Sequence, residues 1–250
     1  MADLTQARVI VTGAATGIGL ATARHFHQLG STVALLDING DAVREQAQQL
    51  DPSGKRALAI ETDVANPDSV ASAFKAALQQ MGQVDVLVNA AAGFTPSERV
   101  TEQSIETWMR AIQVDLTGVF LMCRQVIPAM KSGSVIVNLA SQLGSVASAG
   151  RGSYCAAKGG VIQLTKVLAL DHAADGIRVN SVSPGAVVTD RIIRRFGSAE
   201  AAREQLTPLH PIGRLGEADE IARAVAFVAS DDAAFMTGSD LLIDGGYNAL

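Results

Sequence analysis

Short apolar runs and longer amphipathic stretches alternate along the whole chain. Seven runs rich in Val, Ile, Leu and Ala have the length and composition of buried β-strands; they lie at 8–12, 32–37, 57–60, 84–88, 134–139, 177–182 and 239–244. Between them, apolar side chains recur at helical spacing, for example at 41–50, 67–81 and 104–130. This alternation predicts an α/β fold, with a parallel sheet of about seven strands doubly wound by helices on both faces.

The composition fits one domain rather than several. The chain has 250 residues, 48% of them hydrophobic, which is enough for one sizeable core, and no linker or repeat divides it. We therefore expect a single domain over residues 1–250. Residues 186–216 combine helical pieces with several arginines, and we expect them to form a lid over a ligand site.

Charge and special residues narrow the function. A net charge of −5 argues against a nucleic-acid-binding surface, and no run of 18 or more apolar residues is present that would cross a membrane. The first residues lack the pattern of a signal peptide, so a cytoplasmic protein is expected. Cys123 and Cys155 stand far apart, and the histidines form no ligand set, so neither a disulfide nor a metal site is expected.

The first strand ends in a glycine-rich turn, and a helical pattern follows it. Gly13, Gly17 and Gly19 are spaced G-x-x-x-G-x-G, and the free N–H groups at such a turn and helix start can cradle a phosphate. Thr16 and Ile18 belong to the same turn, so all five positions are candidate cofactor contacts. The spacing differs from the G-x-G-x-x-G fingerprint, and a tight turn without a ligand is the alternative.

The second strand ends in an acid, Asp37, twenty-four residues after Gly13. A Rossmann-like dinucleotide fold places a carboxylate about there, where it binds the hydroxyls of the adenosine ribose. No Lys or Arg occurs at 13–19 or 38–41, so a 2′-phosphate would meet this carboxylate without a compensating cation. NAD is therefore expected rather than NADP. The alternative for Asp37 is a solvated strand end or the cap of the next helix.

Further polar or small residues follow the remaining strands. They are Asp63 and Val64 after the third, Asn89 after the fourth, Ser141 after the fifth, and Pro184 and Gly185 after the sixth. Because ligands bind beyond the carboxyl ends of parallel strands, we expect these residues to gather at one edge of the sheet. Asp63 and Val64 would meet the adenine amine there, and the small residues after Asn89 would let a flat ligand approach the backbone.

Tyr154 and Lys158 stand four residues apart at the start of a long helical pattern. Positions i and i+4 share one face of a helix, so the phenol and the ammonium lie side by side. A tyrosine hydroxyl is a poor base at neutral pH, but a neighbouring cation favours its phenolate form. The pair can therefore move a proton to or from a hydroxyl or carbonyl substrate, unless the spacing is a helical coincidence.

Together these residues resemble the short-chain dehydrogenase/reductase family over nearly the whole chain. The matching motifs are Thr12-Gly13-x-x-x-Gly17-Ile18-Gly19, Ser141 thirteen residues before Tyr154, Tyr154-x-x-x-Lys158, and Pro184-Gly185 followed by Thr189. Asn89-Ala90-Ala91 resembles the family's N-N-A-G segment, with Ala90 and Ala92 in place of Asn and Gly. The resemblance implies hydride transfer between a nicotinamide and a secondary alcohol or ketone. It also implies a homotetramer, and a contact between Thr189 and the nicotinamide carboxamide.

The resemblance also implies roles for the catalytic residues. Ser141 would bind the substrate oxygen, Tyr154 would transfer its proton, and Lys158 would hold the nicotinamide ribose. Asp115 occupies the place where the family usually has Asn in an N-x-x-G segment. The backbone carbonyl of that Asn holds a water that leads to the lysine. We therefore expect Asp115 to complete the catalytic set while adding a charge to it.

Arg191, Arg194 and Arg195 cluster in the expected lid, and Arg151 lies just before Tyr154. An arginine fork binds carboxylate, sulfonate or phosphate groups with two parallel hydrogen bonds. We expect Arg151 and Arg194 to contact the substrate together with Ser141 and Tyr154. The alternative is a solvated helix face or a contact between subunits.

The expected activity is that of an NAD-dependent dehydrogenase of a secondary alcohol, with a small polar or anionic hydroxy compound as the candidate substrate. A 3-oxoacyl-thioester reductase is the alternative within the same class, and the expected NAD preference argues mildly against it. A non-catalytic NAD(H)-binding regulator is the alternative of another class. The complete set of Ser141, Tyr154 and Lys158 argues against that regulator.

Overall fold

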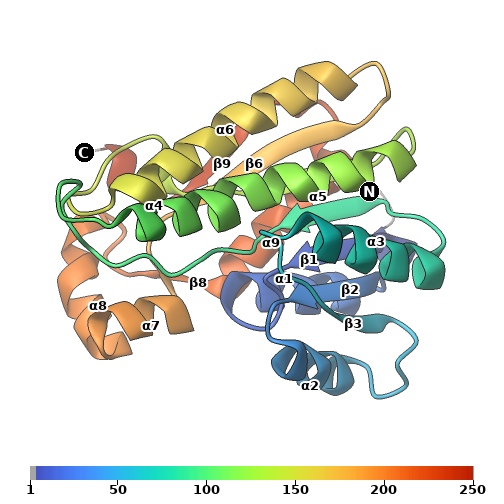
Figure 1. Ribbon diagram of the computed structural model, residues 1–250, viewed down its shortest axis with the longest axis horizontal. Helices are drawn as coiled ribbons and strands as arrows, with labels where there is room; N and C mark the ends of the chain where they lie inside the picture. Colours follow the sequence, from blue (N-terminus) through green and yellow to red (C-terminus); the bar gives the residue numbers. More distant parts are fainter. Residues whose placement is uncertain (1–3, 250) are drawn as a thin grey trace.

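One parallel sheet of seven strands runs through the computed structural model, which describes residues 4–249 (Figure 1). The strands are β1 (Arg8–Thr12), β2 (Thr32–Asp37), β3 (Ala57–Glu61), β4 (Val86–Asn89), β5 (Val135–Leu139), β6 (Arg178–Pro184) and β9 (Asp240–Ile243). Their order across the sheet is β3-β2-β1-β4-β5-β6-β9, and every neighbouring pair is parallel. The predicted fold class and number of strands are confirmed.

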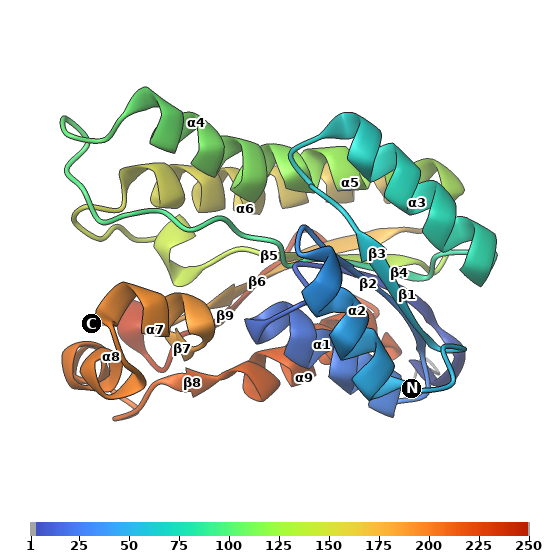
Figure 2. The ribbon, with the colours of Figure 1, turned by 60° about the horizontal axis from the view of Figure 1, so that its bottom comes forward.

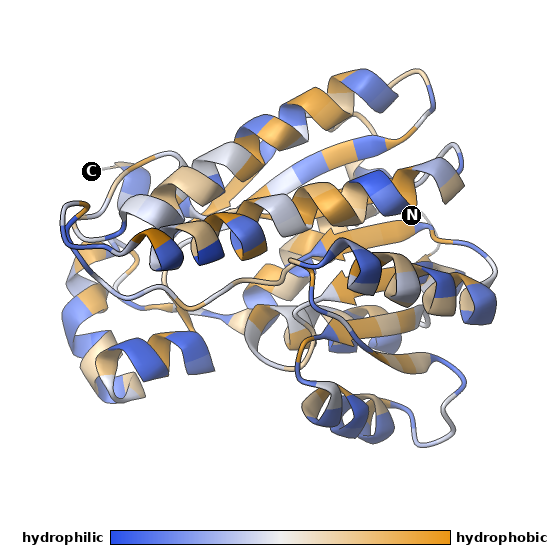
Figure 3. Cartoon of the chain, in the orientation of Figure 1, coloured by the Kyte–Doolittle hydropathy of each residue, from blue (hydrophilic) through white to orange (hydrophobic). Residues whose placement is uncertain are grey.

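Helices cover both faces of this sheet, as Figure 2 shows. One face carries α3 (Pro67–Met81), α4 (Ile105–Ile112), α5 (Gly118–Val126) and α6 (Gly152–His172), and the other carries α1 (Gly17–Gln28), α2 (Gly40–Leu50) and α9 (Ala218–Ala229). A separate cluster of buried apolar side chains fills each side. The central strands face apolar helices on both sides, which explains why their sequences are continuous apolar runs rather than alternating ones (Figure 3).

The long helical pattern at 104–130 is not one regular helix. Residues Gln113–Thr117, between α4 and α5, form a π-helical turn. A π-turn inserts an extra residue into the helix and is often found at functional sites. Asp115 lies in this turn with its side chain fully buried, so the position that departs from the family pattern is also the position where the helix is irregular.

The expected lid is bounded by a small ladder that the sequence did not predict. Strands β7 (Val187–Val188) and β8 (Gly216–Glu217) pair in parallel outside the main sheet. The amide of Gly216 also donates to the carbonyl of Ala186 at 2.9 Å. The two ends of the segment are thus tied together, and α7 (Asp190–Phe196) and α8 (Ala199–Leu206) lie between them.

The strand limits differ slightly from the expectation. β6 continues to Pro184, because Pro184 still pairs with Ile243 of β9. β4 begins at Val86 and runs through Asn89, which pairs with Asn138. Within residues 4–249, no helix combines the length and apolar character that crossing a membrane requires.

The close packing of the glycine turn leads to a stability prediction. Gly13 and Gly82 both have positive φ, at 66° and 75°, so an alanine at either position costs roughly 1–2 kcal/mol in the left-handed region. Only at Gly13 would the new Cβ also lie 2.7 Å from the Cα of Ala91, whereas at Gly82 no described atom lies within 4 Å. Urea unfolding should therefore give a lower midpoint for Gly13→Ala than for Gly82→Ala. Equal midpoints would show that the Ala91 segment moves away at no cost.

Candidate active site

A cavity of about 530 Å³ lies beyond the carboxyl ends of the central strands. Ser141, Tyr154 and Lys158 line it together, as the spacing of the sequence motif predicted. Residues of the segment 186–216 form further walls, and the chain returns near its end to place Tyr247 there as well. The site therefore draws on residues from the middle and the end of the chain.

Ser141 follows β5 and begins the short 3-10 turn Gln142–Gly144. Its Oγ accepts a hydrogen bond from the amide of Leu143 at 3.2 Å, which leaves the hydroxyl proton available to donate. The position of Ser141 and this hydrogen bond both follow from the direction of the chain after β5, because the strand stops at Leu139 and the next residues turn toward the cavity. The Ser141 hydroxyl can thus donate to a substrate oxygen.

Tyr154 and Lys158 lie one turn apart near the start of α6. Lys158 is only 2% exposed, and its Nζ donates to the carbonyl oxygen of Leu139 at 2.7 Å. The same nitrogen lies 5.9 Å from the centre of the Tyr154 ring. The ammonium is therefore fixed between the end of β5 and the tyrosine.

Two glycines of the turn, Gly13 and Gly19, pack too tightly to carry side chains. A Cβ on Gly19 would collide with the carbonyl of Gly13, and a Cβ on Gly17 would touch the Thr189 side chain at 3.4 Å. Thr16 precedes α1 without capping it, so its exposed hydroxyl is not used by the helix. Ile18 and Thr189 line the cavity, which places this turn and the start of the lid around one space.

Asp37 is held in place by the turn that it faces. Its Oδ2 accepts from the amide of Ala15 at 3.1 Å, and its Oδ1 accepts from the amide of Asn39 at 2.9 Å. The carboxylate is only partly buried, so a ligand can still reach it. The nearby Arg44 is already bound to Asp41 at 2.7 Å and lies 3.8 Å from Glu61. The surroundings of Asp37 are therefore acidic.

The remaining residues expected at the cofactor are held in different ways. Asp63 accepts from the amide of Ala65 at 2.9 Å and lies 4.0 Å from Arg110, at the end of β3. Val64 is buried. Pro184 and Gly185 line the cavity together with Ser141, Tyr154 and Lys158.

Asn89 is directed into the protein interior rather than into the cavity. It is 3% exposed, and its Nδ2 donates to Asn138 Oδ1 at 2.8 Å. Asn138 in turn donates to Thr165 Oγ1 at 2.9 Å, which links β4, β5 and α6 through buried polar groups. Asn138 and Thr165 could not be recognised from the sequence, because nothing in the local pattern of a strand or a helix shows that two polar residues will meet.

The carboxylate of Asp115 binds a backbone amide. Its Oδ1 accepts from Gly93 at 2.6 Å, and its Oδ2 has no partner within residues 4–249. Lys158 donates instead to Leu139. The structure thus gives Asp115 a contact that fixes the segment after β4, and it shows no direct contact between this carboxylate and the ammonium.

Three arginines line the cavity, and they are not the full set that the sequence indicated. Arg151, Arg191 and Arg195 are in the lining, whereas Arg194 is exposed and lies outside it, with its guanidinium carbon 6.0 Å from the Phe94 ring. The packing of a helix against its neighbours decides which of its side chains face inward. In α7, Arg191 and Arg195 face the cavity. The expectation that Arg194 lies at the substrate is therefore corrected. The arginines of α7 that reach the cavity are Arg191 and Arg195.

Two other side chains that could be reactive, Cys123 and His210, are occupied by burial or by internal hydrogen bonds. Cys123 is buried, and burial raises the pKa of its thiol to about 12, so it is no nucleophile. His210 lines the cavity, but both ring nitrogens are used, by the Leu206 carbonyl at 2.8 Å and the Ala186 amide at 3.2 Å. The described part of the chain holds no group of three or more His, Cys, Asp or Glu residues suited to a metal ion.

Comparisons with known proteins agree with this geometry. A family model described as "Enoyl-(Acyl carrier protein) reductase" matches residues 13–248. The chain is 41% identical to cis-4-hydroxycyclohexanecarboxylate dehydrogenase of Sinomonas cyclohexanicum, over 96% of each chain. It is 35% identical to the NAD-dependent glycerol dehydrogenase of Listeria innocua, over 98% of this chain and 95% of that protein.

The fold comparison gives the same result. A short-chain type dehydrogenase/reductase from Mycobacterium marinum superimposes with a TM-score of 0.90 at 31% identity, over 99% of both chains. The match extends over the glycine turn, the seven-stranded sheet and the segment that carries Ser141, Tyr154 and Lys158. The chain therefore belongs to the short-chain dehydrogenase/reductase family, and it is an oxidoreductase that acts on CH–OH groups.

Proposed function

We propose that this enzyme is an NAD-dependent dehydrogenase of a small secondary alcohol, and that it also reduces the corresponding ketone. The observation that carries this proposal is one cavity lined both by Ser141, Tyr154 and Lys158 and by Ile18, Pro184, Gly185 and Thr189. The first group suits proton transfer, and the second suits a flat cofactor ring. The two relatives act, by their names, on a ring that bears a carboxylate and on glycerol, so the alcohol is the feature that they share.

The residues present fit a nicotinamide dinucleotide. Glycines in the Gly13 turn leave no room for side chains, so the backbone can approach a pyrophosphate directly. Asp37 would hold the adenosine ribose, and Asp63 with Val64 would border the adenine. The small residues after Asn89 would pack against the cofactor, while Thr189 would meet the carboxamide. When bound, the cofactor accepts or returns the hydride.

The protein's own residues would manage the proton and the substrate oxygen. The Ser141 hydroxyl would donate a hydrogen bond to that oxygen and stabilise the charge that develops on it. Tyr154 would take the proton from the alcohol during oxidation and return it during reduction. Lys158, fixed by the Leu139 carbonyl, would keep a positive charge near the phenol and hold the nicotinamide ribose. Asp115 would act indirectly, by holding Gly93 and the chain beside it.

The lid and the assembly complete the proposal. We assign residues 186–216 as a substrate lid, because their ends are pinned by β7 and β8 while α7 lies over the cavity. We also propose a homotetramer in the cytoplasm, a compartment that holds NAD. Large apolar side chains are exposed on the adjacent helices α4 and α6, including Ile105 at 75% and Leu170 at 81%, and a subunit contact would cover them.

The first test of the proposal removes the phenol hydroxyl of Tyr154. Tyr154→Phe is expected to lower kcat/KM at least ~100-fold, because the ring remains and only the proton-transferring hydroxyl is removed. The assay follows NADH absorbance with a set of secondary alcohols, and a separate arm offers a 3-oxoacyl thioester. The matched control is Tyr247→Phe, which removes the hydroxyl of the other tyrosine in the same cavity. Comparable activity in the two variants would show that another group carries the proton.

Cofactor choice gives a second test. We expect kcat/KM to favour NAD over NADP by at least tenfold, about 1.4 kcal/mol, because the Asp37 carboxylate repels a 2′-phosphate. Asp37→Ser should lower the ratio of kcat/KM with NAD to kcat/KM with NADP. Asp41→Ser is the control, because Asp41 is an exposed acid of the same region that is bound to Arg44. Equal turnover with the two cofactors in the wild type would contradict the role of Asp37.

A third test separates the shape of Asp115 from its charge. Asp115→Asn is expected to keep activity within a few-fold, because an amide oxygen can accept the Gly93 hydrogen bond as well. Asp115→Ala would leave the partly buried Gly93 amide without its partner and should lower the free energy of unfolding by about 1–3 kcal/mol. Steady-state kinetics and urea unfolding measure both effects. An inactive but fully folded Asp115→Asn enzyme would mean that the carboxylate itself takes part in the reaction.

A further inference from the structure

The cavity carries an unbalanced charge. Four cationic side chains line it, Arg151, Lys158, Arg191 and Arg195, and no Asp or Glu is found among the described residues of its lining. The whole chain, by contrast, has a net charge of −5. Lys158 is explained by the catalytic arrangement, but that arrangement leaves the three arginines without a role.

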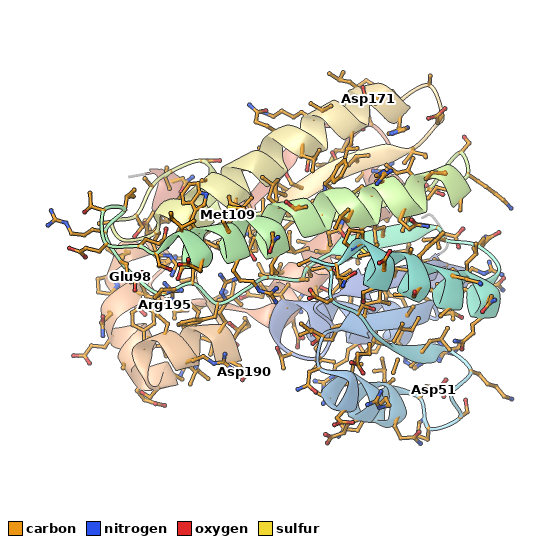
Figure 4. The ribbon with its side chains drawn as sticks, viewed as in Figure 1. Asp51, Glu98, Met109, Asp171, Asp190 and Arg195 are labelled. Atoms are coloured by element: carbon orange, nitrogen blue, oxygen red, sulfur yellow. The ribbon has the colours of Figure 1, made fainter. Side chains whose placement is uncertain are left out.

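Two of these arginines are brought together by one neutral acceptor. Arg195 Nη2 donates to the carbonyl oxygen of Thr95 at 2.7 Å, and Arg151 Nη1 donates to the same oxygen at 3.4 Å. Arg195 comes from α7 of the lid and Arg151 from the residue before α6, so three segments of the chain meet at Thr95 (Figure 4 labels Arg195). A carbonyl dipole orients two guanidinium groups but cannot neutralise their charges.

The third arginine converges on the catalytic tyrosine. The guanidinium carbon of Arg191 lies 4.6 Å from the centre of the Tyr154 ring, and that of Arg151 lies 4.8 Å from it. Arg191 Nη2 is buried and has no hydrogen-bond partner within residues 4–249. A buried donor without a partner is costly, and a ligand atom would satisfy it.

No carboxylate of the described chain compensates these charges. The ion pairs within 4.0 Å that the structure shows involve other basic residues. Arg151 is 8% exposed, and burial lowers the pKa of the Arg195 guanidinium. Cations that are withdrawn from water without an acid beside them destabilise the protein, unless a bound anion supplies the missing charge.

We propose that the substrate of this cavity is a compact hydroxy compound with an oxyanion group, a carboxylate, sulfonate or phosphate, bound by Arg151, Arg191 and Arg195. Its carbinol would lie at Ser141 and Tyr154, so this assignment rests on the proposed function and refines its substrate class. The oxyanion would accept hydrogen bonds from guanidinium groups of α7 and of the residue before α6, two of which already meet at the Thr95 carbonyl, and its binding would hold the lid closed. Remote binding energy of this kind positions the reacting group.

The test uses binding, which does not depend on turnover. Cyclohexanecarboxylate and cyclohexanecarboxamide are titrated into the enzyme with saturating NADH, and dissociation constants are measured by calorimetry. The wild type should bind the carboxylate at least about tenfold more tightly than the neutral amide, because hydrogen bonds to charged groups are the stronger kind. Saturating NADH ensures that the anion does not merely occupy the phosphate site of the cofactor.

The variants locate the effect. Arg195→Ala and Arg151→Gln should each remove most of the preference for the carboxylate. Arg194→Ala is the matched control, because it removes the same charge from the same helix but from an exposed position outside the cavity. Circular dichroism verifies folding, and Arg195→Gln, which keeps most of the side chain, replaces any variant that fails to fold.

The outcomes separate the two proposals. Equal affinity of the wild type for the two probes, or an equal loss of preference in Arg194→Ala and Arg195→Ala, would overturn the anion site. A kinetic arm with 3-hydroxybutyrate and 3-hydroxybutyramide should show KM rising selectively for the acid in Arg195→Ala. If no alcohol is oxidised while carboxylate binding still requires Arg195, the dehydrogenase proposal fails and the anion site stands.

Discussion

The buried ammonium of Lys158 is the constraint on which the active site depends. A cation that is 2% exposed must be bound by polar groups, and the partner that the fold supplies is the last carbonyl of β5, at 2.7 Å. This one bond fixes the start of α6 against the end of the strand. Ser141, two residues beyond that carbonyl, and Tyr154, one helical turn before the lysine, are then held on the same cavity wall.

Packing around this bond leaves little freedom. A Cβ on Gly144 would lie 2.9 Å from the carbonyl oxygen of Lys158, so the turn that carries Ser141 lies directly against α6. Deeper in the sheet, the chain of hydrogen bonds from Asn89 through Asn138 to Thr165 joins β4 and β5 to the same helix. Hydrogen bonds between buried polar groups hold the elements that they join in a fixed arrangement. Ser141, Tyr154 and Lys158 therefore owe their positions to the packing of the core.

The parts of the site that could be predicted from the sequence are those with a local cause. Strand ends, the glycine turn and the spacing of Tyr154 and Lys158 follow from periodicity and chain direction alone. The contacts of Asp115 with Gly93, and of Asn138 with Thr165, join elements that are distant in the sequence, so no local pattern indicates them. The choice between Arg194 and Arg195 likewise depends on how α7 packs, because a helical pattern without a clear apolar face has no defined inward side.

The two sets of cations in the cavity differ in how the fold compensates them. Lys158 has a fixed acceptor and a neighbouring phenol, so its charge is part of a completed internal arrangement. Arg151 and Arg195 share one neutral carbonyl, and Arg191 Nη2 has no hydrogen-bond partner within residues 4–249, so no acid of the described chain balances their charges. A protein gains nothing in stability from cations held in this way. β7 and β8 tie together the two ends of the segment that carries α7, and α7 brings two of these charges to the cavity. On the proposed assignment, one end of the substrate would be bound by charge, and Ser141 and Tyr154 would act on the other end.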